Sequence, residues 1–211
     1  KRPELNRKDL TQTIESILKS VKIGKDKAIV ELTNQFDGVE LKSIKVKGSE
    51  FEIAEKSVSE KLKNAIQIAK QNIEKFHNSQ VEASKIIETT TGVQCWRKSV
   101  GIEKVGLYIP GGSAPLFSTI LMLAIPAKIA GCSEIVLCTP PNNEGTIDPA
   151  ILYTAALVGV AKIYKVGGAQ AIAAMAFGTE SIPRVYKIFG PGNQYVTKAK
   201  ELIQQEGDAI D

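Results

Sequence analysis

Apolar residues in the first part of the chain recur at the spacing of amphipathic helices. One stripe begins at Leu10 and ends before Gly24, and a shorter stripe ends at Phe36, just before an Asp-Gly pair. A third and longer stripe runs over residues 58–76. Residues three and four positions apart share one face of a helix, so each stripe predicts a helix with one buried face.

Two stretches in the same part of the chain have β character instead. The apolar residues at positions 39–46 alternate imperfectly and could form one short strand. Residues 88–100 are rich in Thr and Val around Gly92, which predicts a β-hairpin. We therefore expect residues 1–104 to form a helical segment with a small β element.

The pattern changes at about residue 105. Short apolar, β-branched runs predict four strands, at residues 105–109, 134–138, 162–166 and 185–189. A helical stretch follows each run, at residues 115–130, 149–158, 169–176 and 193–205. Strand–helix units in series predict an α/β fold over residues 105–211, with a mainly parallel sheet that carries helices on both faces.

Three of the predicted strands end in turns that contain glycine. The turns read IPGGS at residues 109–113, VGGAQ at 166–170 and FGPGN at 189–193. Parallel sheets bind ligands at the carboxyl ends of their strands, and glycine followed by a helix N-terminus suits a phosphate group. The turns therefore predict a nucleotide-binding edge, although none matches G-x-G-x-x-G or the P-loop pattern. The alternative is that these glycines only allow tight turns.

A polar side chain stands at each of these turns. Tyr108 ends the first strand, and its ring could cover a base, ribose or nicotinamide face. Gln170 and Asn193 each bring an amide donor and acceptor to the start of a helix. The alternatives are core packing for Tyr108 and helix capping for Asn193.

Composition excludes several classes of protein. The chain has 211 residues, a net charge of +4 and 43% hydrophobic residues, which is typical of a soluble globular protein. Its single Trp and the absence of an aromatic–basic platform speak against nucleic-acid binding, and its apolar runs are too short for a membrane span. The three cysteines lack metal-site spacing, so we expect buried, unpaired thiols and a cytoplasmic location.

The residues by themselves do not form a recognisable reaction centre. His77 is the only histidine, and a structural or solvent-facing role suits it better than a catalytic one. A zinc site needs three or four convergent ligands, and no cluster of His, Cys, Asp or Glu supplies them. We therefore assign no catalytic and no metal-binding residue within the chain.

Three motifs closely resemble the histidinol dehydrogenase family. They are VGLYIPGGSAPLFSTILMLAIPAKIAGCSEIVLCTPP at residues 105–141, VGGAQAIAAMAFGTESIPRVYKIFGPGNQYVTKAK at 166–200 and GDAID at 207–211. The resemblance implies an incomplete Rossmann-like fold in which Tyr108, Gln170 and Asn193 contact NAD. It also implies a zinc-dependent homodimer that oxidises L-histidinol, through L-histidinaldehyde, to L-histidine, which is the end of histidine biosynthesis.

The resemblance places the family's zinc ligands, its Glu-His acid–base pair and its substrate-binding serine beyond Asp211. We therefore expect an N-terminal fragment that holds the NAD-binding half of the enzyme and is itself inactive. Two alternatives remain open. One is a stand-alone nucleotide- or anion-binding module without redox chemistry, and the other is a non-catalytic partner chain that completes a dimer.

Overall fold

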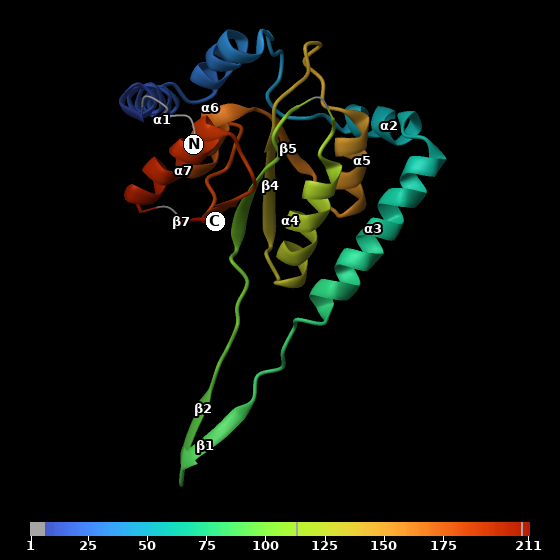
Figure 1. Ribbon diagram of the computed structural model, residues 1–211, viewed down its shortest axis with the longest axis vertical. Coiled ribbons are helices and arrows are strands. Elements are labelled where there is room, and N and C mark those ends of the chain that lie inside the picture. The colour runs from blue at the N-terminus through green and yellow to red at the C-terminus, as the bar shows by residue number, and fades with distance from the viewer. Residues whose placement is uncertain (1–6, 113, 208) are drawn as a thin grey trace, which may run out of the picture.

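A parallel β-sheet forms the centre of the protein (Figure 1). The computed structural model describes residues 7–112, 114–207 and 209–211, and within these residues the central sheet has five strands in the order β5-β4-β3-β6-β7. The strands are β3 (Lys104–Tyr108), β4 (Glu134–Thr139), β5 (Lys162–Lys165), β6 (Lys187–Phe189) and β7 (Ala209–Ile210). The predicted parallel α/β fold is confirmed. The predicted number of strands was too low, because β7 has only two residues and shows no pattern in the sequence.

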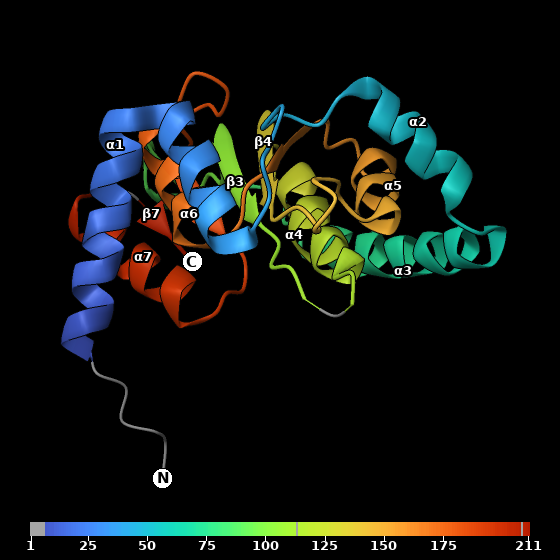
Figure 2. The same ribbon diagram turned by 90° about the horizontal axis from the view of Figure 1, so that it is seen from above.

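Helices cover both faces of this sheet (Figure 2). One layer contains α1 (Arg7–Asp37), α6 (Gly168–Phe177) and α7 (Gln194–Gln205). The other contains α2 (Gly48–Ser57), α3 (Glu60–Asn78), α4 (Phe117–Ile129) and α5 (Pro149–Leu157). Each of the two hydrophobic cores combines residues from before and after position 104, while the division of the chain into two domains at that position stays a prediction.

The first two predicted helices form one element, α1, with a break at Lys25. This residue has φ 50° and ψ −131°, one position after the predicted stop at Gly24. The Lys25 ammonium donates to the carbonyl of Gly178 at 2.9 Å, and the Asp26 amide donates to a Glu180 carboxylate oxygen at 2.9 Å. These contacts with the segment after α6 hold the second part of α1 in its new direction.

The predicted hairpin consists of β1 (Ile86–Thr90) and β2 (Val93–Trp96), and it projects away from the body as an arm (Figure 1). Every residue from 78 to 100 is exposed. The expectation of buried cysteines is therefore wrong for Cys95, which lies on this arm, whereas Cys138 is buried and Cys132 is partly buried. Residues 39–46 form only a single antiparallel bridge, from Lys45 to Tyr164, rather than a regular strand.

Candidate functional site

The three glycine-bearing turns lie together at the carboxyl edge of the sheet. The first and second turns both touch Pro140, which directly follows β4. A Cβ atom added to Gly111 or Gly167 would lie 2.6 Å from the Pro140 side chain, so each turn passes closer to the proline than any residue with a side chain could. The predicted convergence of these turns is therefore present in the fold.

The third turn rests on the backbone of the first strand. Gly190 has φ +129°, and a Cβ atom at this position would lie 2.2 Å from the carbonyl oxygen of Tyr108. Only glycine can adopt this conformation at this distance from another backbone. The residue after β6 thus packs directly against the last residue of β3, at the candidate binding edge.

Tyr108 lies inside the protein rather than on its surface. It is 3% exposed, and its hydroxyl accepts a hydrogen bond of 3.0 Å from the amide of Gly168. Burial raises the pKa of Tyr108 to about 12, the bond from Gly168 opposes this rise, and the nearby Asp37 carboxylate adds to it. The phenol therefore stays protonated at neutral pH and keeps a hydrogen to donate, while its ring packs in the core as the alternative interpretation held.

The side chains of Gln170 and Tyr108 both lie next to Gly168. The Gln170 side chain is in the first turn of α6 and is 2% exposed. A Cβ atom on Gly168 would lie 2.7 Å from the Gln170 Oε1 atom, so the amide oxygen is directly beside the second turn. The fold thus brings two of the three predicted residues to the same glycine.

Asn193 is exposed and caps α7. Its Oδ1 atom accepts hydrogen bonds from the amides of Tyr195 and Val196, at 3.0 and 3.1 Å. The capping alternative therefore describes what this side chain does in the structure. Both bonds engage Oδ1, and neither involves the Nδ2 donor.

The helices that begin at this edge differ in their caps. The Oδ1 atom of Asn193 caps α7, whereas α4 and α6 have no hydrogen bond from an N-cap side chain. The first amides of a helix lack partners within the helix, and their dipoles give this end a partial positive charge. The starts of α4 and α6 are therefore suited to hold an anion such as a phosphate group.

Asp37 lies near Tyr108, a position that the sequence did not reveal. Within the part of the chain that the structure describes, its Oδ2 atom is buried and has no hydrogen-bond partner. Burial raises the pKa of this carboxyl group above its ordinary value. In the sequence Asp37 is only the first residue of an Asp-Gly pair that ends a helix, and its position near Tyr108 depends on the tertiary fold.

The residues present do not fit a zinc ion. Over residues 7–112, 114–207 and 209–211, no group of three or more His, Cys, Asp and Glu side chains could hold a metal. His77 is partly exposed near the end of α3, and its Nδ1 atom lies 3.0 Å from Gln80 Oε1. The structural or solvent-facing role of His77 stays a prediction.

Comparisons with known proteins give one consistent result. The family model described as histidinol dehydrogenase matches residues 1–211. A histidinol dehydrogenase from Bacteroides thetaiotaomicron is 60% identical over 211 residues, which are 100% of this chain and 49% of that protein. One from Mannheimia succiniciproducens is 54% identical over 205 residues, covering 96% of this chain and 47% of that protein.

A solved structure agrees with these sequence relatives. The crystal structure of histidinol dehydrogenase from Elizabethkingia anophelis matches with a TM-score of 0.96 and 55% identity, over 100% of this chain and 49% of that one. The chain thus spans about half the length of the relatives that it matches.

Proposed function

The chain belongs to the histidinol dehydrogenase family, and from this premise we propose that it supplies the NAD-binding half of a zinc-dependent enzyme. That enzyme would oxidise L-histidinol, through L-histidinaldehyde, to L-histidine. The observation that carries the proposal is the meeting of three glycine turns around Tyr108 and Pro140 at the carboxyl edge of the sheet. The family match over the whole chain favours this function over a stand-alone nucleotide-binding module.

Different residues at the carboxyl edge of the sheet would bind different parts of NAD. Bound NAD would accept the hydride. The N-termini of α4 and α6, which have no side-chain caps, would hold its pyrophosphate, because the positive end of a helix dipole attracts an anion. Gln170 would bind through its amide and Asn193 through its Nδ2 donor.

The zinc ligands and the acid–base pair would come from the rest of the longer protein. The resemblance to the family implies this assignment, and no group of three or more His, Cys, Asp and Glu side chains among the described residues could hold a metal. All three cysteines are unpaired, which fits the cytoplasmic location that we propose. None of the described helices is both long enough and apolar enough to span a membrane.

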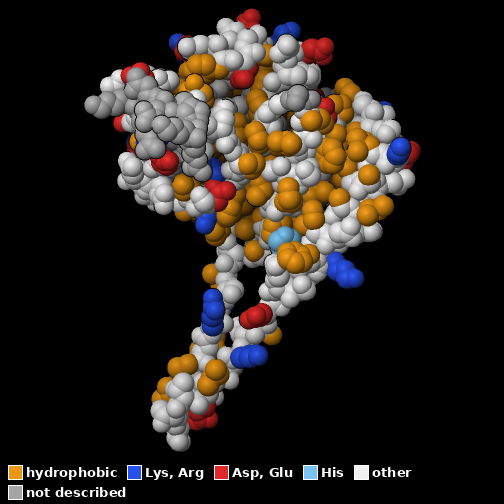
Figure 3. Space-filling view, viewed as in Figure 1, with side chains coloured by type: hydrophobic (Ala, Val, Ile, Leu, Met, Phe, Trp, Pro, Cys, Tyr) orange, Lys and Arg blue, Asp and Glu red, His pale blue; other side chains and the backbone are white. Residues whose placement is uncertain are grey.

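We also propose that the full-length protein is a homodimer. Apolar side chains gather on the face of the body beside α3 and α4, and others lie along the hairpin arm (Figure 3). Exposed apolar side chains on these elements include Phe76 of α3, Met122 of α4 and Trp96 of β2, which are 62%, 52% and 61% exposed. An isolated two-stranded hairpin is marginally stable in water, so the arm is expected to contact further protein. These features support a covered surface in the assembled enzyme.

Replacing the two amide side chains in the full-length protein tests the NAD site. Gln170→Met keeps the volume of a buried side chain and removes its amide, and Asn193→Asp keeps the Oδ1 cap while replacing the Nδ2 donor with an anionic oxygen. One neutral hydrogen bond contributes about 0.5–1.5 kcal/mol, so the KM for NAD should rise roughly two- to tenfold in Gln170→Met. Asn193→Asp should raise it further, because a carboxylate repels phosphate.

Steady-state kinetics at saturating L-histidinol measure these changes. Gln204→Met, at an exposed position on α7, is the matched control and should leave the KM for NAD unchanged. If Gln170→Met and Asn193→Asp both behave like this control, the assignment of the site is wrong.

A further inference from the structure

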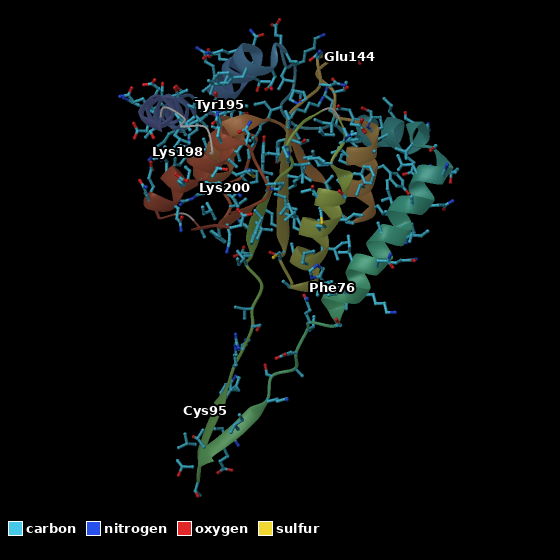
Figure 4. The ribbon with its side chains drawn as sticks, in the orientation of Figure 1. Phe76, Cys95, Glu144, Tyr195, Lys198 and Lys200 are labelled. Atoms are coloured by element: carbon cyan, nitrogen blue, oxygen red, sulfur yellow. The ribbon has the colours of Figure 1, made fainter. Side chains whose placement is uncertain are left out.

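Lys200 is a buried cation next to the third glycine turn. It lies on α7 and is only 7% exposed. Lys198 lies on the same helix (Figure 4). It forms an ion pair with the exposed Glu201, with 3.1 Å between the ammonium nitrogen and the nearer carboxylate oxygen. Burying an ammonium group is unfavourable unless anionic or polar partners surround it, so the partners of Lys200 indicate what its burial achieves.

Lys200 and Asp211 together hold both backbone groups of Gly190. The Lys200 ammonium donates to the Gly190 carbonyl oxygen at 2.7 Å, and it also pairs with the Asp211 carboxylate. The second carboxylate oxygen of Asp211 accepts from the Gly190 amide at 2.9 Å. The Asp211 amide in turn donates to the carbonyl of Ile188 in β6, at 3.1 Å. The result is a clamp made of Lys200, Asp211 and Gly190.

Gly190 can be held in place only through its backbone, and the clamp binds both its amide and its carbonyl. Gly190 has no side chain, and its φ of +129° is a conformation that glycine reaches without the steric restraint of a Cβ atom. Hydrogen bonds to charged groups are stronger than those between neutral groups, and here one is made at each end of the residue. The clamp therefore restrains the turn where it touches Tyr108 and leads into Asn193.

We propose that Lys200 is a positioning residue for NAD. Together with Asp211 it fixes the turn at residues 190–192, and so determines where Asn193 stands relative to Tyr108 and the second turn. Lys200 acts through the turn and is not a catalytic residue. The inference rests on the proposed function, because it identifies what holds the proposed NAD site in shape.

Lys200→Met in the full-length protein tests this inference. Methionine keeps most of the length of the side chain and removes the charge, while Lys200→Arg keeps the charge. The turn would then no longer hold Asn193 in place, and the loss of one neutral hydrogen bond corresponds to a roughly two- to tenfold rise in the Kd for NAD in Lys200→Met. The KM for L-histidinol should change little, Lys200→Arg should recover part of the NAD affinity, and Lys198→Met should match the wild type.

Titration calorimetry with NAD and thermal unfolding of the same samples separate positioning from stability. If Lys200→Met does not fold, the double variant Lys200→Met/Asp211→Leu replaces it, because that change leaves no unpaired buried charge. A folded variant with a lowered Tm and an unchanged Kd for NAD would overturn the inference, because Lys200 would then serve stability alone. A wild-type protein that binds no NAD would overturn the proposed function itself, and this failure is visible before any variant is made.

Discussion

A polypeptide of residues 1–211 alone should neither oxidise L-histidinol at a measurable rate nor bind zinc stoichiometrically. It has one histidine, His77, which is hydrogen-bonded to Gln80 near the end of α3. The described residues include no group of three side chains that could hold a metal. A positioned general base is worth about 10²–10⁴-fold in rate, and the metal's contribution would be missing as well.

Metal analysis and an assay of NADH formation on the purified polypeptide measure this effect. The full-length protein, prepared in the same way, is the positive control. NADH formation that depends on L-histidinol and exceeds background, in a sample that mass spectrometry shows to be free of full-length protein, would disprove the assignment of the catalytic groups to the rest of the enzyme.

Gly190→Ala, in the third turn, should be strongly destabilising. The new Cβ atom would lie 2.2 Å from the Tyr108 carbonyl oxygen, and a backbone atom within a sheet cannot move aside. Overpacking a tight contact costs about 1–3 kcal/mol, and a left-handed conformation costs a residue with a side chain about 1–2 kcal/mol more. We expect the free energy of unfolding to fall by about 2–5 kcal/mol.

Gly112→Ala is the matched control, since a Cβ atom on Gly112 meets nothing within 4 Å. Surface changes of this kind usually alter stability by less than about 0.5 kcal/mol. Urea unfolding of the full-length variants gives both values. Equal stability of Gly190→Ala and Gly112→Ala would mean that the third turn does not rest on Tyr108 as the structure has it.

Most of the fold could be predicted because its elements repeat a local pattern. The strands β3 and β4 are largely buried apolar runs, and α5 follows its N-cap Asp148, whose carboxylate accepts from the Ala150 amide at 2.8 Å. The strand β7 could not be predicted, because two residues become a strand only by pairing with β6. The break at Lys25 likewise depends on contacts with the distant segment after α6.

The candidate site could be predicted only where a short stretch of sequence has a recognisable pattern by itself. Glycines after strands indicate a binding edge, and the three turns do converge. Pro140 and Asp37 give no such signal, because each acquires its surroundings from segments far away in the sequence. Lys200 gives none either, because its partners Gly190 and Asp211 lie outside α7, one before the helix and one after it. In the sequence, Lys200 is indistinguishable from the exposed lysines of an amphipathic helix.

A crystal structure of the full-length protein with NAD tests the central claim most directly. The account predicts that NAD lies across the carboxyl edge of β3, β5 and β6, with its pyrophosphate at the starts of α4 and α6 and with Gln170 and Asn193 in contact with it. Clear density for NAD at any other place, with these three turns empty, would contradict it.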